Sequence, residues 1–332
     1  MRSKIFALIL FFIMWCIFGW SYDIHDYPNY EETFVNSQSM IELGLVNIGY
    51  NYINYFFCSK DWSFFEFRIL YSFICIFALF VVIYKYSIRP SIVLILYGIT
   101  IFFVDLVQMK NFLAYLFCLF GLGYLLDNNI KGKIKYLVCI SIAVSIHIAT
   151  IFYIIFIFTD LQKKIQWKKV FILGLVSSAF LPKVIHTVII ISGLRIHDTL
   201  FNYSIFSLIP STAVLLFNIF VVRYFTNYNP LPSKFPLFKL GSDKKSVNLI
   251  YNINVLCLFL MPLAYLSAVS MRLDRNLVII NLIFILNRII MNRYRMTYSQ
   301  SIILIIWMTF NFLYFVFSTG VIGNIISNNY LF

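Results

Sequence analysis

The sequence has little charge, and acidic residues are especially scarce. Only 12% of the 332 residues are charged, and the chain has 13 Asp and Glu against 26 Lys and Arg. Soluble proteins carry about twice this share of charge. With 61% hydrophobic residues, one soluble core would leave almost nothing polar to face water. This composition excludes a soluble enzyme and a disordered protein.

Cysteine and histidine patterns are also missing. The six cysteines form no C-x-x-C pair and lie mostly inside apolar runs. We interpret them as small buried hydrophobic residues, which excludes a disulfide scaffold. The four histidines have no metal-ligand spacing. We predict neither a metal ion nor another cofactor.

Long apolar runs fill most of the chain. A membrane-spanning helix needs about 20 apolar residues, and the continuous runs lack the alternation of a membrane β-barrel. The sequence therefore predicts an all-α, polytopic membrane bundle with a single transmembrane domain over 1–332. No cleavage site follows the first run, which we interpret as an uncleaved span. The runs are 4–20, 62–84, 91–107, 111–126, 136–159, 170–191, 207–224, 248–269, 273–290 and 299–319.

The basic residues predict the topology. Arg2 and Lys4 favour a cytoplasmic N-terminus, which puts the acidic and aromatic connection 21–61 outside. If 136–159 crosses once, most later basic residues fall outside. If it enters and returns on one side, 225–247 becomes a cytoplasmic Pro/Lys loop and only seven of the 26 basic residues stay outside.

We therefore prefer nine full transmembrane helices plus one re-entrant segment at 136–159, with its tip near 145–147. Non-helical backbone at membrane depth is tolerated where protein covers it or it lines a wet cavity. Ten crossings remain the alternative, because 24 apolar residues make about 36 Å of helix, and the tip contains no Gly or Pro.

The segment SAVSMRLDRN carries the most distinctive outward cations. Arg272 and Arg275 are three residues apart, on one helical face, with Asp274 between them. Guanidinium groups offer paired donors to phosphate oxygens, so this end of a span suits a diphosphate. An interfacial anchor or a structural ion pair is the alternative.

Three more basic positions are candidates. Lys110 lies between two spans near the outer surface, where it contacts an anion or snorkels to the interface. His147 is either a satisfied core residue or, with a re-entrant segment, a member of a polar cavity. Arg195 is a further outward cation in the connection 192–206.

The outer connection supplies the carboxylates. Asp26, Glu31 and Glu32 are candidate general bases for activating a hydroxyl. Tyr30 and its neighbours either stack on sugar rings or line the membrane interface. The stretch 45–57 is aromatic and amphipathic, which is typical of a helix lying flat on the outer surface.

The ordered motifs resemble a known family across nearly the whole chain. They are D-Y-x-x-Y (26–30), N-I-G-Y (47–50), QMKNFLA (108–114), S-I-H-I-A (145–149) and R-L-D-R (272–275). This set resembles the EpsG/Wzy-type bacterial polysaccharide polymerases. The family pattern implies a Glu where this chain has Asn47 and an Arg where it has Lys110. Because of these departures, the resemblance does not imply an acidic role for Asn47 or bidentate phosphate binding by Lys110.

The resemblance implies a GT-C-like glycosyltransferase of the bacterial cytoplasmic membrane, independent of metal, with an outward-facing active site. It moves a growing glycan from its polyprenyl-diphosphate carrier onto the terminal sugar of the next lipid-linked repeat unit. Arg272 and Arg275 would stabilise the leaving diphosphate, with Lys110 and His147 assisting. We expect the other substrate contacts at Tyr30, Asn47, Tyr50, Asp274 and Arg195.

The expected partners are the polyprenyl-diphosphate-linked oligosaccharide and the bilayer, with the pathway's flippase and chain-length regulator as further partners. Nucleic acid is not expected despite the net charge of +13, because the basic residues sit in short clusters between apolar runs. O-antigen, capsule and exopolysaccharide remain equal options for the product.

Two rival functions are a membrane O-acyltransferase that modifies surface glycans and a lipid-linked sugar flippase or transporter. The first span lacks the histidine common in such acyltransferases, and His25 lies in a loop. Transporters often show repeats and Gly- or Pro-broken spans. No repeat is visible here, and we locate the polar residues mainly near the outer surface.

Overall fold

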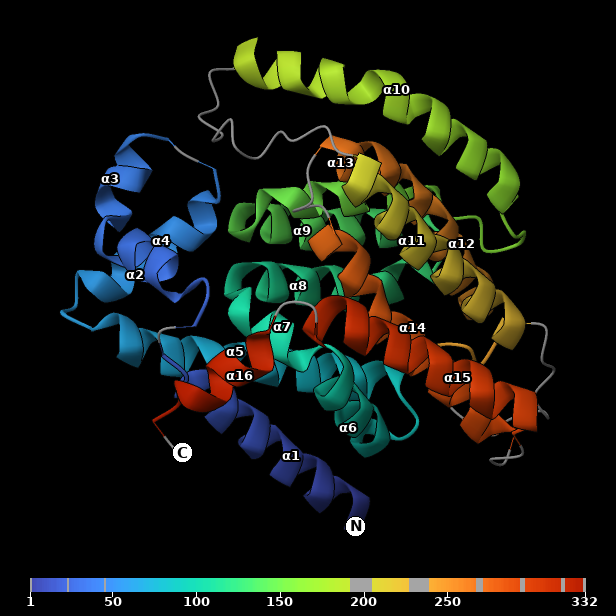
Figure 1. Ribbon diagram of the computed structural model, residues 1–332, viewed down its shortest axis with the longest axis horizontal. Coiled ribbons are helices and arrows are strands. Elements are labelled where there is room, and N and C mark those ends of the chain that lie inside the picture. Colours follow the sequence, from blue (N-terminus) through green and yellow to red (C-terminus); the bar gives the residue numbers. More distant parts are fainter. Residues whose placement is uncertain are drawn as a thin grey trace. The chain divides into compact units, whose positions relative to one another are not determined.

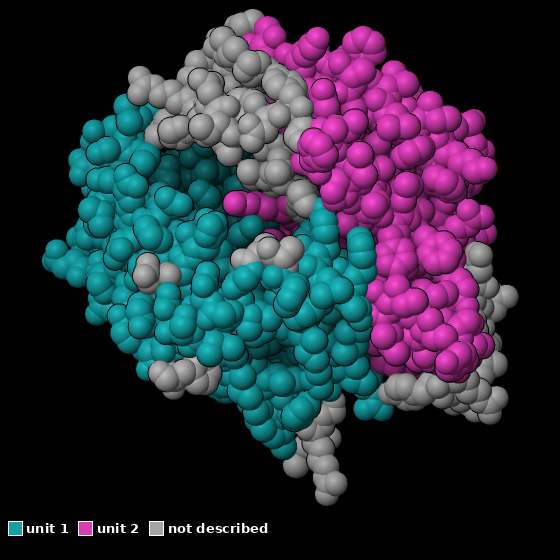
Figure 2. Space-filling model, in the orientation of Figure 1, with its two compact units in different colours: residues 1–154, 308–332 teal, residues 155–307 magenta. Residues whose placement is uncertain are grey.

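The computed structural model describes residues 2–22, 24–44, 46–191, 205–226, 239–266, 271–292, 296–317 and 320–330. Within these ranges the secondary structure is helical, apart from one isolated β-bridge between Ser21 and Asn329. The chain forms two compact units, 1–154 with 308–332 and 155–307, which Figure 2 shows in teal and magenta.

The first unit begins with a helix that packs on two later ones. Helix α1 lies against α5 and α6, while α8 packs on α5 and α9. Gly121 allows α8 and α9 to approach closely, because a Cβ there would lie 3.0 Å from the Cβ of Cys139. The elements are α1 (Arg2–Gly19), α2 (Tyr27–Val35), α3 (Ser37–Glu42), α4 (Ile48–Cys58), α5 (Phe64–Tyr86), α6 (Pro90–Thr100), α7 (Phe102–Val107), α8 (Met109–Leu125), α9 (Ile130–Ile146), the 3-10 helix η1 (Ile148–Phe158), the π-helix η5 (Phe312–Val316) and α16 (Val321–Ser327).

The connection 21–61 is built from helices. Helices α2, α3 and α4 pack on one another and stand together in Figure 1. Helix α4 covers most of the stretch expected to lie flat on a surface. Its Tyr50 and Asn54 are buried, whereas Tyr52 and Phe56 are more than half exposed, and its position on a membrane surface stays a prediction. This small helical group gives the polar residues of the connection fixed positions.

The chain reverses direction at His147. Helix α9 ends at Ile146, His147 is extended (φ −147°, ψ 109°), and η1 runs back. The hydroxyl of Tyr136 donates to the carbonyl of Tyr153 over 2.8 Å. A continuous helix would separate these two residues by about 25 Å. The reversal lies at the predicted tip, and the position of this hairpin relative to a membrane stays a prediction.

The second unit surrounds one buried helix. Helix α14 packs against α11 and α12, and Asn281 of α14 exchanges two side-chain hydrogen bonds of 2.8 Å with Asn254 of α12. Each amide thereby satisfies the other inside an apolar core. The elements are α10 (Trp167–Ile191), α11 (Ile205–Thr226), α12 (Lys244–Leu256), the 3-10 helix η3 (Cys257–Leu260), α13 (Met261–Leu266), α14 (Met271–Met291) and α15 (Tyr298–Asn311).

Every predicted apolar run contains a helix, but some runs are broken. The run 91–107 divides at Ile101 into α6 and α7. Among the described residues, four helices are long and apolar enough to cross a membrane, and shorter apolar helices accompany them. The four are Phe64–Tyr86, Ile205–Thr226, Lys244–Leu266 and Tyr298–Val316. The full count of spans and the GT-C-like architecture stay predictions.

Candidate functional site

Two predicted tyrosines from separate segments of the first unit lie around one predicted lysine. The ammonium of Lys110 lies 5.6 Å from the ring centre of Tyr30 and 5.8 Å from that of Tyr50. The two rings are 6.2 Å apart. A cation within about 6 Å of an aromatic face is attracted to it. We call Tyr30, Tyr50 and Lys110 the lysine–tyrosine cluster.

Helix geometry makes this cluster attractive to an anion. Lys110 is half-buried and lies in the first turn of α8, which begins at Met109. The helix dipole is positive at this end, and a cation there costs about 0.3–1 kcal/mol. An anion bound beside Lys110 would relieve that repulsion and interact with both positive charges.

Tyr50 adds a neutral donor. Burial, and then the neighbouring Tyr30, raise the pKa of the Tyr50 hydroxyl well above its ordinary value, so the group stays protonated at neutral pH. The buried Asn54 amide lies beside this hydroxyl and acts on its pKa in the opposite direction, but among the described residues neither group makes a hydrogen bond of good geometry. Buried polar groups normally have such partners, so both groups suit a polar ligand such as a sugar.

Asn47 joins the outer helices to the hairpin tip. It adopts the left-handed conformation (φ 66°) that asparagine tolerates, and its Oδ1 accepts the Ile148 amide over 2.8 Å. The Thr150 amide and hydroxyl both donate to the His147 carbonyl. These bonds hold the half-buried His147 next to the start of α4.

Gly49 permits this close approach. A Cβ at Gly49 would lie 2.5 Å from Oγ, 2.9 Å from Cβ and 3.0 Å from the carbonyl oxygen of Ser145. No larger residue fits without moving α4 away from α9. The motifs at 47–50 and 145–149 are therefore two sides of one contact.

The three candidate bases differ in position. Asp26 is half-buried and is the N-cap residue of α2, where its carbonyl accepts the Tyr30 amide over 3.2 Å. Glu31 and Glu32 are exposed and rotated about 100° and 200° from buried Tyr30. The structure thus gives Asp26 a half-buried place at the start of α2 and leaves the two glutamates exposed on other sides of the helix.

Arg68 is a residue that our site prediction did not select. It is completely buried, its Nη2 donates to Ser21 Oγ over 2.8 Å, and its guanidinium lies 5.5 Å from the Tyr27 ring. It thus fixes the start of α2 to α5. A lone arginine inside the apolar run 62–84 was the available signal, because ionisable residues are rare in spans.

The arginine motif lies in the second unit. Arg272 is half-buried at the start of α14, whereas Arg275 is only 2% exposed and Asp274 is fully buried. The Ser211 hydroxyl of α11 donates to the Asp274 carboxylate. Of the three, Arg272 alone keeps substantial access to a ligand. Arg195 lies outside the described residues.

The motifs are spread along most of the chain, from 26–30 to 272–275. The EpsG family model matches residues 4–331. The chain belongs to the EpsG family. No curated protein and no solved structure matches the chain. The EpsG family supports a polysaccharide polymerase-type role in general, and the apolar helices indicate a multi-pass membrane protein.

Proposed function

We propose that this EpsG family protein polymerises polysaccharide by moving a growing glycan from its polyprenyl-diphosphate carrier onto the terminal sugar of the next lipid-linked unit. One observation carries the proposal: α2, α4, α8 and the hairpin tip together bring a lysine, two tyrosines, an asparagine and a histidine into one region. Sugar recognition needs aromatic faces and polar donors, and the leaving diphosphate needs cations.

The proposed reaction is a glycosyl transfer. The acceptor hydroxyl attacks the anomeric carbon of the carrier-linked sugar, and the bond from that carbon to the diphosphate oxygen breaks. The electron pair leaves with the lipid diphosphate. Asp26 takes the hydroxyl proton, because it is half-buried and its backbone is bonded to that of Tyr30, whereas Glu31 and Glu32 are exposed.

Cationic side chains supply the proposed electrostatic assistance. Lys110 and the positive end of α8 act on phosphate oxygens as point charges, without the paired donors of an arginine. In the second unit, Arg272 is proposed to stabilise diphosphate charge, because it is the accessible cation of its motif. Arg275 and Asp274 are proposed to position it from inside the second unit. His147 is proposed to contact the substrate at the hairpin tip.

The cellular setting belongs to the same proposal. We propose the bacterial cytoplasmic membrane, a cytoplasmic N-terminus and an outward active site, following the charge bias of the connections. The substrate is a polyprenyl-diphosphate-linked oligosaccharide, and the flippase and chain-length regulator of its pathway are the proposed protein partners.

Gene deletion with complementation tests the proposal. Deletion should abolish long polymer and accumulate single lipid-linked repeat units on the outer face. Wild type should restore the ladder of chain lengths, and Asp26→Asn should not, at equal protein abundance. Glu31→Gln is the matched control and should restore it.

Other outcomes would contradict the proposal. Units accumulating on the inner face would indicate a flippase. Normal chain lengths with a missing acyl group would indicate an O-acyltransferase.

A further inference from the structure

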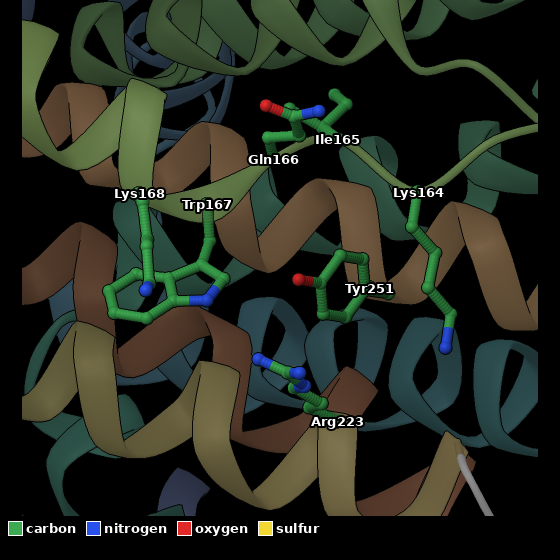
Figure 3. Close-up of a pocket in the computed structure, with 7 residues that line it drawn as sticks. All are labelled: Lys164, Ile165, Gln166, Trp167, Lys168, Arg223 and Tyr251. Atoms are coloured by element: carbon green, nitrogen blue, oxygen red, sulfur yellow. The ribbon is translucent and has the colours of Figure 1, made fainter.

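A cavity of about 440 Å³ opens in the second unit, away from the motif residues. Lys164 and Lys168 flank the start of α10, Arg223 comes from the last turn of α11 and Tyr251 from α12. Figure 3 shows Trp167, Tyr251 and Arg223 directed toward a common space. We call this the basic pocket.

Its described lining contains three cations and no carboxylate. The two nearby acids are engaged elsewhere: Asp160 accepts the Gln162 amide over 2.7 Å, and Asp243 accepts the Ser246 amide over 3.0 Å. Partial desolvation of its ammonium, and then the charges of Arg223 and Arg288, lower the pKa of the otherwise exposed Lys164. That direction is expected of like charges held together.

Two asparagines of α12 hold the pocket's loop in place. Asn252 Oδ1 accepts the Ile165 amide over 2.8 Å, and its Nδ2 donates to the Lys163 carbonyl over 2.9 Å. One turn earlier, Asn248 donates to the Leu161 carbonyl over 3.0 Å. Lys164 in turn donates to Thr226 Oγ1 over 2.9 Å and lies 5.3 Å from the Tyr251 ring. The site is thus built before any ligand arrives.

The surroundings of the pocket favour a lipid as the ligand. Helix α10 leads away from Trp167 with an exposed apolar surface formed by Ile172, Leu173, Val176 and Phe180, each more than half exposed. Trp and Tyr are typical of the headgroup level of a membrane. A basic pocket beside an apolar helix face matches the two parts of an anionic phospholipid.

We propose that the basic pocket binds the phosphate of an anionic phospholipid whose acyl chains lie along α10. In the preferred topology this pocket faces the cytoplasm. The proposal does not depend on the polymerase reaction, because none of the proposed catalytic residues lines the pocket.

Lipid retention by the purified full-length protein tests it. The protein is exchanged into micelles containing phosphatidylglycerol, and bound lipid is counted by native mass spectrometry. Each cation near a membrane surface contributes about 1 kcal/mol. Arg223→Gln should therefore weaken binding about fivefold, and Lys164→Gln with Arg223→Gln about 25-fold. Lys163→Gln, in the same loop, and Lys169→Gln, in the first turn of α10, are matched controls, exposed but outside the pocket, and should stay near wild type.

Three results would overturn the proposal: equal retention in pocket and control variants, equal retention of phosphatidylcholine by the wild type, or binding of inorganic diphosphate with no phosphatidylglycerol retained. The last would assign the pocket to a soluble phosphate compound. Gel filtration should show all five proteins to be equally monodisperse, because every substituted side chain is exposed.

Discussion

Adding one methyl group at Gly49 should move helix α4 away from the end of α9 and the hairpin tip at His147. The new Cβ in Gly49→Ala would meet Ser145 at 2.5, 2.9 and 3.0 Å. Rotation of the Ser145 hydroxyl removes the first clash, but the Cβ and the carbonyl oxygen of Ser145 cannot rotate away. Helix α4 must therefore move from α9 by about 0.5–1 Å, and overpacking of this kind costs about 1–3 kcal/mol.

The displacement matters because of a neighbouring bond. The Asn47 Oδ1 to Ile148 amide distance is 2.8 Å, and a further shift of about 0.5–1 Å weakens or breaks this hydrogen bond. His147 would then lose its fixed place, and a misplacement of about 1 Å can cost about 10²-fold in rate. Gly49→Ala should thus shorten the polymer ladder far more than it lowers protein abundance.

The assay combines chain-length ladders, immunoblots of membranes and thermal unfolding in detergent. Ser145→Gly removes two of the three clashing atoms, so the double variant Gly49→Ala with Ser145→Gly should recover activity in part. Gly98→Ala is the matched control, because a Cβ at that helical glycine meets no atom within 4 Å. Normal ladders in Gly49→Ala, or no recovery in the double variant, would refute the reasoning.

Further predictions concern five other positions. Asn47→Gly keeps the left-handed backbone but removes the side-chain oxygen that accepts the Ile148 amide, so it should lower the free energy of unfolding by about 1 kcal/mol and shorten the polymer. Asn47→Asp keeps an accepting oxygen and should stay closer to wild type. Denaturation curves and chain-length ladders check both variants. Lys110→Met should abolish long polymer and Lys110→Arg should retain it; equal ladders in both would contradict a charge-based role. Arg272→Ala should reduce polymerisation about 10²–10³-fold at unchanged abundance, with only partial rescue by Arg272→Lys; a parallel fall in abundance would indicate a structural anchor. Cysteines at Lys164 and Lys168 should react only with membrane-permeant reagents in intact cells, and labelling by an impermeant reagent would reverse the preferred topology.

The helical architecture could be predicted because hydrophobicity alone specifies it. Each of the ten apolar runs contains a helix. The division of 91–107 at Ile101 and the helical build of 21–61 could not be predicted, because both depend on tertiary packing. Ile101 is buried between α6 and α7, and its own side chain carries no turn signal.

The hairpin at His147 shows the same limit more sharply. The charge bias located a reversal near 145–147, although no Gly or Pro marks it. The structure explains why none is needed: one extended residue turns the chain, and Asn47, 101 positions away, satisfies the Ile148 amide. The residues around the hairpin cannot reveal a hydrogen-bond acceptor that comes from so distant a part of the chain.

Site residues were predictable by type more than by position. Lys110, Tyr30 and Tyr50 were selected separately and prove to be neighbours. Arg275 is predicted to share the diphosphate charge with Arg272, and the core of the second unit buries it to 2% exposure. Spacing along a helix gives a shared face but does not say what covers that face.

Reconstitution of the purified protein tests the central claim most directly. The protein in liposomes receives one lipid-linked oligosaccharide repeat unit on its outward side, and the products are resolved by length. Wild type should convert single units into a ladder with release of the lipid diphosphate, while Asp26→Asn should yield neither. Loss of single units from the outer leaflet without any longer product would contradict the account.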